Sequence, residues 1–97
     1  MYLEIVSPEA TLFSNKVAAV SVPGVEGNFQ MLENHAAIVS VLEKGTVKID
    51  MNTVADAEIN AWNEQLKTSK ENAKIVTLDI LSGTVEMKDN KVIILVD

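Results

Sequence analysis

The most constraining feature of this sequence is its pattern of short apolar runs, each ended after a few positions by residues typical of turns. Residues 46–51 alternate strictly, with Val47, Ile49 and Met51 on one face and polar residues on the other. Alternation with a period of two is the pattern of a half-buried strand. The sequence therefore predicts an all-β chain, an antiparallel β-sandwich or flattened barrel of about 8–10 short strands.

The segments between these runs are short turns rather than linkers. Lys44-Gly45 and Ser82-Gly83 each reverse the chain, and Asp89-Asn90 suits a two-residue hairpin. No internal repeat, low-complexity tract or Pro/Gly-rich linker interrupts the pattern. We therefore expect residues 1–97 to form a single domain.

One stretch departs from the strand pattern. Ala55, Ile59, Trp62 and Leu66 recur at helical spacing among good helix formers, which predicts a helical insertion near residues 56–69. A strand is the rival interpretation, because alternate residues from Ala55 to Ala61 are also apolar. Counting strand reversals predicts that this insertion leaves the sandwich at the end that carries His35. Covering a sheet edge is the favoured role for the insertion, and widening a partner contact is the sharper alternative.

Charge and composition exclude several classes of protein. The formal net charge is −6, so both a nucleic-acid backbone and an anionic lipid surface are unfavourable partners. The chain has no cysteine, which excludes disulfides, thiol catalysis and zinc–thiolate sites. No apolar run approaches the roughly 20 residues that span a bilayer, and we expect a cytosolic protein.

Candidate catalytic residues are few. His35 is the only histidine, and no nucleophile-elbow motif surrounds any serine. Glu26, Glu33 and Glu43 could be paired as carboxylates, but a solvated acidic rim is the simpler interpretation. Gly24 and Gly27 are spaced as turn residues and not as a phosphate cradle. We therefore predict no catalytic, metal or cofactor site.

Three segments resemble the epsilon subunit of F-type ATP synthases. They are YLEIVSPEATLF at residues 2–13, VAAVSVPGVEGNFQMLENHAAIVSVL at residues 17–42 and SGTVEMKDNKVIILVD at residues 82–97. The second is similar to the family pattern P-G-x-E-G-x-[FL]-G followed by G-H-A-P, and the third to a closing S-G-G-x-[LV]-E-V. In this order and spacing the segments cover most of the predicted sandwich.

This sequence departs from the family pattern at several positions. Gln30 replaces the glycine of F-G, Asn34 replaces the glycine before His35, and Thr84 replaces the second glycine of S-G-G. Asn34 can still adopt the left-handed conformation that glycine would supply. Residues 52–73 replace what is usually a much shorter hairpin tip.

The resemblance implies a non-catalytic rotor subunit that links the gamma subunit to the c ring at the cytoplasmic face of the bacterial inner membrane. It helps couple proton or sodium transport to ATP synthesis, with the ion left open. By position, the implied c-ring contacts are Glu26, Asn28, Glu33 and His35, all expected at one end of the sandwich. The implied gamma-subunit contacts are Ser7, Ser40, Val41 and Leu42.

The family's C-terminal helical hairpin follows the segment that matches residues up to Asp97, where this sequence stops. Without a partner, we expect the domain to be a monomer. A stand-alone β-sandwich adaptor or ligand-binding module is the alternative function, and a small acidic hydrolase is a third. Binding to a gamma subunit would distinguish the rotor subunit from the adaptor and the hydrolase, because only the rotor subunit requires it.

Overall fold

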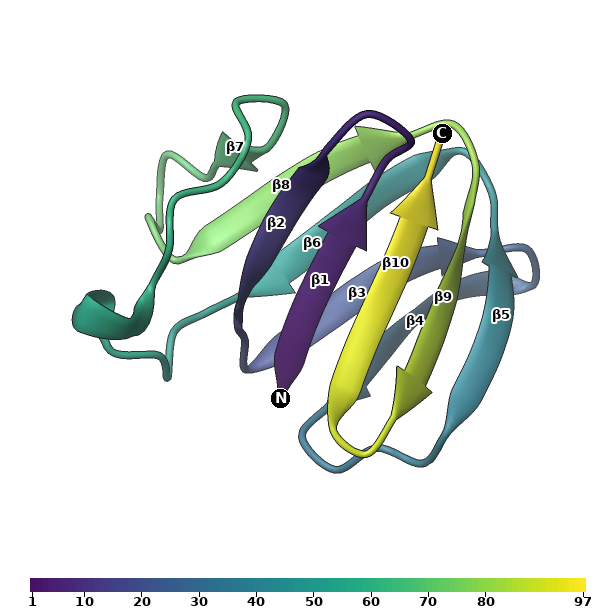
Figure 1. Cartoon of the computed structure of the whole chain (residues 1–97), viewed down its shortest axis with the longest axis horizontal. Coiled ribbons are helices and arrows are strands. Elements are labelled where there is room, and N and C mark those ends of the chain that lie inside the picture. Colours follow the sequence, from purple (N-terminus) through teal and green to yellow (C-terminus); the bar gives the residue numbers. More distant parts are fainter.

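Ten strands form one curled sheet that folds over into two packed layers (Figure 1). The computed structural model describes all residues from 1 to 97. The strands are β1 (Tyr2–Val6), β2 (Thr11–Lys16), β3 (Ala19–Gly24), β4 (Gly27–Leu32), β5 (Ile38–Leu42), β6 (Gly45–Asp50), β7 (Lys67–Thr68), β8 (Ile75–Ile80), β9 (Gly83–Lys88) and β10 (Lys91–Val96). The predicted all-β fold is confirmed, and no helix is long and apolar enough to cross a membrane.

The first layer contains the strands in the order β2-β1-β10-β9-β5, and the second contains β4-β3-β6-β8-β7. The layers are joined by one pairing, between Leu42 of β5 and Gly24 of β3. Every pair of neighbouring strands is antiparallel except β1 and β10, which run parallel. The predicted antiparallel arrangement therefore holds at all pairs but this one.

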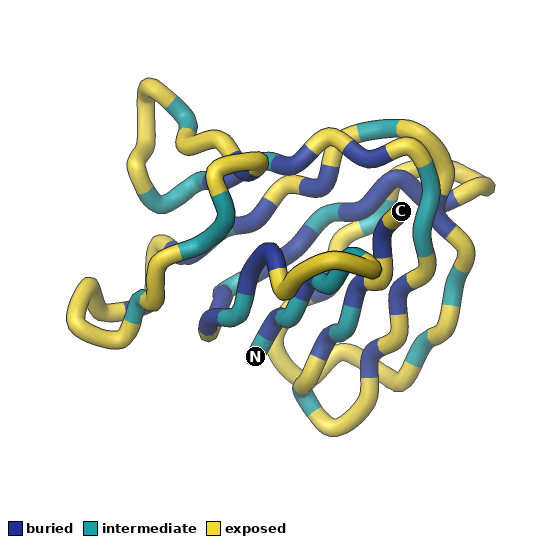
Figure 2. Tube along the Cα trace, turned by 45° about the horizontal axis from the view of Figure 1, so that its top comes forward, coloured by how far each residue is buried: buried dark blue, intermediate teal, exposed yellow.

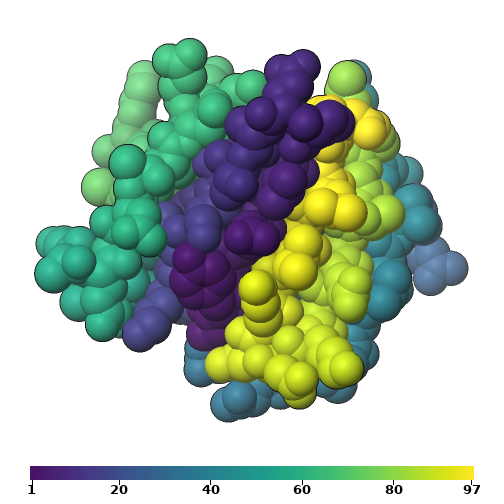
Figure 3. Space-filling model, in the orientation of Figure 1, coloured from purple at the N-terminus to yellow at the C-terminus, as the bar shows by residue number.

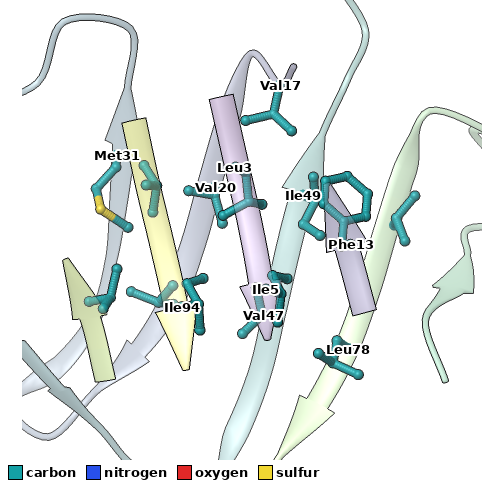
Figure 4. Close-up of a cluster of buried hydrophobic side chains, with 14 of the residues drawn as sticks. Leu3, Ile5, Phe13, Val17, Val20, Met31, Val47, Ile49, Leu78 and Ile94 are labelled. Atoms are coloured by element: carbon teal, nitrogen blue, oxygen red, sulfur yellow. The ribbon is translucent and has the colours of Figure 1, made fainter. Parts of the chain in front are cut away.

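Alternate strand residues point into the space between the layers, as the alternation of buried and exposed positions shows (Figure 2). Nearly all the buried apolar side chains form one cluster of 23 residues, which does not include Ala19. Leu3, Ile5 and Ile94 enter it from the first layer, and Val20 and Val47 enter it from the second (Figure 4). Burial of this cluster is the main contribution that stabilises the two-layer arrangement.

The hairpin between β9 and β10 has the turn that its sequence predicts. Asp89 and Asn90 have φ angles of 51° and 62°. Positive φ at both central residues matches the twist of the flanking strands, and Asp and Asn tolerate it better than most side chains.

The prediction of a helix over residues 56–69 is wrong. The segment contains only a single turn of 3₁₀ helix, Asp56–Glu58, and residues 59–63 then run extended along β2. The Asn15 side chain binds both the backbone N–H and C=O of Asn60, at 2.5 and 3.0 Å, and the Asn63 N–H donates to the Leu12 carbonyl at 2.9 Å. These contacts use backbone groups that a helix needs for its own hydrogen bonds.

The apolar residues of the predicted helical stripe still reach the core. Leu66 is buried, and Ile59 and Trp62 pack against the core cluster while half-exposed, but Ala55 lies in solvent. The segment lies against the N-terminal strands in the space-filling view (Figure 3). It covers the outer edge of β2, which is the role that we favoured.

The predicted exit point of the insertion is confirmed. Asp50, the last residue of β6, pairs with Ala19, and Ala19 also pairs with Leu32 at the end of β4. The insertion therefore leaves the sandwich at the end that carries the loop of His35.

Candidate partner-binding surfaces

Glu26 and Asn28 lie in and just after the turn that joins β3 to β4. Both side chains are exposed, and neither makes a hydrogen bond or an ion pair within the chain. Gly27 has a φ of 124°, a conformation that side chains rarely adopt, so the turn requires glycine there. This turn presents free polar groups to solvent on a short, well-defined hairpin tip.

Glu33 and His35 lie at the other end of β4. A six-residue strand separates the two pairs, which corresponds to roughly 20 Å at the usual rise per residue. The structure therefore does not bring together the four residues that the resemblance implies for the c ring. It places Glu26 and Asn28 at one end of the sandwich and Glu33 and His35 at the opposite end.

The polar groups around His35 are largely used within the chain. Glu33 is paired with the Met1 amino group and accepts a hydrogen bond from the Asn90 amide. The Asn34 N–H donates to the Asn90 side chain at 2.8 Å, and Nδ1 of His35 lies 2.8 Å from the Ala36 carbonyl oxygen. This loop is fastened to the β9–β10 hairpin.

Asn34 has a φ of 60°, so it does take the left-handed conformation that the sequence indicates. Asn34→Ala should lower the free energy of unfolding by about 1 kcal/mol, because alanine tolerates this conformation poorly. Asn34→Gly should leave stability the same or raise it slightly. Urea unfolding of the two variants checks this, and equal losses would show that the side chain and not the backbone conformation matters.

The four residues implied for the gamma subunit belong to one end of the first layer. Val6 pairs with Leu95, Leu95 with Thr84, and Thr84 with Val41. Ser7 follows Val6, and Ser40 and Leu42 flank Val41, so these positions lie along neighbouring rows of the same sheet. Leu42 itself is 2% exposed, so its side chain belongs to the core rather than to the surface.

Sequence reasoning missed most of the apolar surface at this end. Six large hydrophobic side chains are exposed in the chain, and five of them gather where β5, β9 and β10 meet the β3–β4 turn. We call these five the apolar corner: Val25, Val39, Val41, Leu81 and Leu95. The nearly continuous apolar run at residues 38–42 was the signal available in the sequence, since both of its faces carry apolar residues.

An open surface pocket of about 490 Å³ lies at the opposite end, lined by Lys16, Glu33 and Glu58 together with apolar residues such as Val17 and Val54. Lys16 and Glu58 form an ion pair at 3.5 Å. Burial, and then the charge of Lys16, lower the pKa of the Met1 amino group below its usual value. No group of three or more His, Cys, Asp or Glu side chains could hold a metal ion.

Two curated relatives match nearly the whole chain. It is 37% identical over 98 residues to the ATP synthase epsilon chain of Campylobacter fetus subsp. fetus (strain 82-40), covering 100% of this chain and 60% of that protein. It is 33% identical over 96 residues to the ATP synthase epsilon chain of Rhodopseudomonas palustris (strain BisA53), covering 99% and 56%. The chain thus spans less than two thirds of the length of these relatives.

Solved structures with a similar fold come from mitochondrial ATP synthases. A chain of the central stalk/c-ring structure from Tetrahymena thermophila matches with a TM-score of 0.66 and 17% identity, over 99% of this chain and 62% of that chain. A chain of the OSCP/F1/c-ring structure from Euglena gracilis matches with a TM-score of 0.68 and 20% identity, over 97% and 48%. At this identity the likeness establishes the fold.

The family model for the β-sandwich domain of the ATP synthase delta/epsilon chain matches residues 1–97. This match covers every strand of both layers, and it agrees with the three segments whose resemblance the sequence carries. The chain belongs to the ATP synthase delta/epsilon family, as its β-sandwich domain.

Proposed function

We propose that this chain is a non-catalytic rotor subunit of an F-type ATP synthase, where it joins the gamma subunit to the c ring. In this role it belongs to a peripheral complex at the cytoplasmic face of the bacterial inner membrane. It helps couple proton or sodium transport to ATP synthesis by transmitting force rather than by chemistry. Family membership supports this proposal, as do relatives that carry the name ATP synthase epsilon chain.

The apolar corner is the observation that carries the proposal. Val39 and Leu81 are 77% and 74% exposed in a chain that otherwise buries its large aliphatic side chains well. A cluster of exposed aliphatic residues is unfavourable in water and typical of a surface that another protein covers. We assign this surface to the gamma subunit, with Ser7, Ser40 and Val41 among its contacts.

The β3–β4 turn is the better of the two candidate contacts with the c ring. Glu26 and Asn28 have no polar partner within the chain and are therefore available to polar loops of another subunit. Glu33 is already paired with the Met1 amine and bonded to Asn90, so a new contact there would first cost these interactions. We therefore propose the Glu26 end as the contact, with His35 outside it.

A charge in the apolar corner should weaken binding to the gamma subunit. Val41→Lys should lower the affinity for the purified gamma subunit of the same organism by about tenfold or more, because it places a hydrated ammonium group in an apolar contact. Isothermal titration calorimetry of the two purified proteins measures this, and co-purification from membranes with a tagged chain extends it to the assembled enzyme.

Leu32→Lys is the matched control for this measurement. Leu32 is exposed to almost the same extent, 53% against 58%, but it lies at the opposite end of the sandwich. Leu32→Lys should leave the affinity for the gamma subunit unchanged, although it changes the net charge by the same amount as Val41→Lys. Equal losses in both variants would indicate a charge effect and no defined surface, and an absence of binding by the wild-type chain would contradict the proposed function itself.

A further inference from the structure

One edge of β5 is largely unpaired. On one side β5 pairs with β9 along its whole length, from Ile38 to Leu42. On the other side its only pairing is between Leu42 and Gly24. The N-terminal half of β5 therefore borders solvent on that side, next to the most exposed apolar side chain of the chain, Val39.

The other open edges are protected in the ways that usually prevent unwanted strand pairing. Residues 59–63 cover the edge of β2 through the bonds of Asn63 and Asn15. The edge strand β7 is only two residues long and carries Lys67. The outward residues of β4 are the polar Asn28 and Gln30 and, at the end of the strand, the exposed Leu32. The edge of β5 has no cover, and its outward residues, Val39 and Val41, are both apolar.

The backbone of Val39 points toward the open side. The Val41 carbonyl accepts a hydrogen bond from the Val25 N–H at 3.4 Å, and the Glu43 N–H donates to the Pro23 carbonyl at 2.9 Å. Residues 41 and 43 thus direct their polar backbone groups away from β9. Because these directions alternate along a strand, the N–H and C=O of Val39 point the same way, where β5 has no partner strand.

A groove of about 350 Å³ runs beside this edge, between β5 and the β3–β4 turn. Phe29 from β4 and Ile38 from β5 line it, and both pack against the core cluster while remaining half-exposed. Ser40 adds to the lining on the side of β5, and Val25, Glu26 and Asn28 line the wall formed by the β3–β4 turn, next to the proposed contact with the c ring. A strand that paired with β5 would place alternate side chains over this apolar floor.

We propose that an extended segment of the partner protein adds a strand to the free edge of β5, with the backbone of Val39 at its centre. This inference rests on the proposed function, under which the partner is the gamma subunit. Backbone hydrogen bonds then supply affinity, and the groove over Phe29 and Ile38 selects a segment with apolar side chains at alternate positions. Glu43 follows the end of β5, and Glu86 lies opposite Val39 on the neighbouring strand β9. Neither forms an ion pair in the chain, so both favour lysine or arginine in the added segment.

Proline at position 39 tests this directly. Val39→Pro removes an N–H that points to the open edge and that no strand of the free chain pairs, so the variant should keep the wild-type melting temperature. Its affinity for the purified gamma subunit should fall by about tenfold or more. Val39→Thr is the matched control, because it keeps the N–H and the β-branched shape, and it should lose less than Val39→Pro.

Amide hydrogen exchange of the wild-type chain gives a second measurement that does not depend on a variant. The Val39 N–H should exchange at least about a hundredfold more slowly in the complex than in the free chain. If the chain binds gamma while Val39 stays unprotected and Val39→Pro binds normally, strand addition is wrong and the proposed function stands. If the wild-type chain fails to bind gamma, both fail. A concentration-dependent dimer with a protected Val39 would instead assign the edge to a second copy of this chain.

Discussion

Phe13→Ala should lower the free energy of unfolding by about 3–5 kcal/mol. Phe13 is the largest fully buried side chain and is 1% exposed, and its ring centroid lies 5.9 Å from that of Trp62. Its removal leaves a cavity beneath β2 and takes away the surface on which Trp62 rests. Because domains of this size have a stability of about 5–15 kcal/mol, the loss is a large part of the total. Urea unfolding measures it.

Two further measurements make this prediction specific. Trp62 is the only tryptophan, so its fluorescence reports the contact directly, and the emission of the folded Phe13→Ala variant should shift to longer wavelength. Leu81→Ala is the control, since Leu81 is 74% exposed and its truncation should cost less than about 0.5 kcal/mol. A loss below 1 kcal/mol for Phe13→Ala would mean that the region around β2 is not packed as described.

Asn15→Leu should lower the free energy of unfolding by about 2–4 kcal/mol, although leucine is apolar and similar in size. Asn15 is the only buried polar residue and is completely inaccessible to solvent. Its side chain satisfies the N–H and C=O of Asn60 in two part-buried hydrogen bonds, and leucine would remove both while the insertion stays packed against β2. An unsatisfied buried polar group costs more than the lost hydrogen bond alone.

Asn60→Ala provides the matched control, because Asn15 binds the backbone of residue 60 and not its side chain. The alanine variant loses only an exposed contact, a hydrogen bond from the Asn60 amide to the Ser14 carbonyl. Its cost should stay below about 1 kcal/mol. Amide exchange should show faster exchange at Asn60 and Asn63 in Asn15→Leu alone. Similar losses in both variants would show that the Asn60 side chain, and not Asn15, fastens the insertion.

The strands were predictable because their pattern is local. The alternation at Val47, Ile49 and Met51 indicates which face of the strand is buried, whatever the rest of the chain does. The turn residues indicate where each strand ends. The parallel pairing of β1 with β10 has no such local signal, since the partners lie at opposite ends of the sequence. Neither does the extended path of residues 59–63, which depends on a contact between Asn15 and Asn60 across 45 positions.

The arrangement of the candidate contacts was predictable in part. Residues 28–32 have the apolar positions Phe29 and Met31 on one face, as a strand does, and a strand of that length must separate the turn of Glu26 from the loop of His35. A single strand between two loops places them at opposite ends of a sandwich. The resemblance had placed Glu26 and His35 at the same end, so the sequence alone could have shown that this arrangement is wrong. The open edge of β5 could not be predicted from the sequence. Whether an edge is open depends on how all the other strands pair, and no local pattern shows that.

The place of β10 in the first layer has a consequence for the order of assembly during synthesis. β10 lies between β1 and β9, so the first layer lacks its central strand until residues 91–96 have left the ribosome. The β1–β2 hairpin forms early from local contacts, yet Leu3 and Ile5 cannot be fully covered until the last strand arrives. Pairings of such high sequence separation are slow to form, and the waiting edge of β1 is open to association with other nascent chains. The two-layer sandwich therefore passes through a vulnerable stage that lasts until β10 has been made.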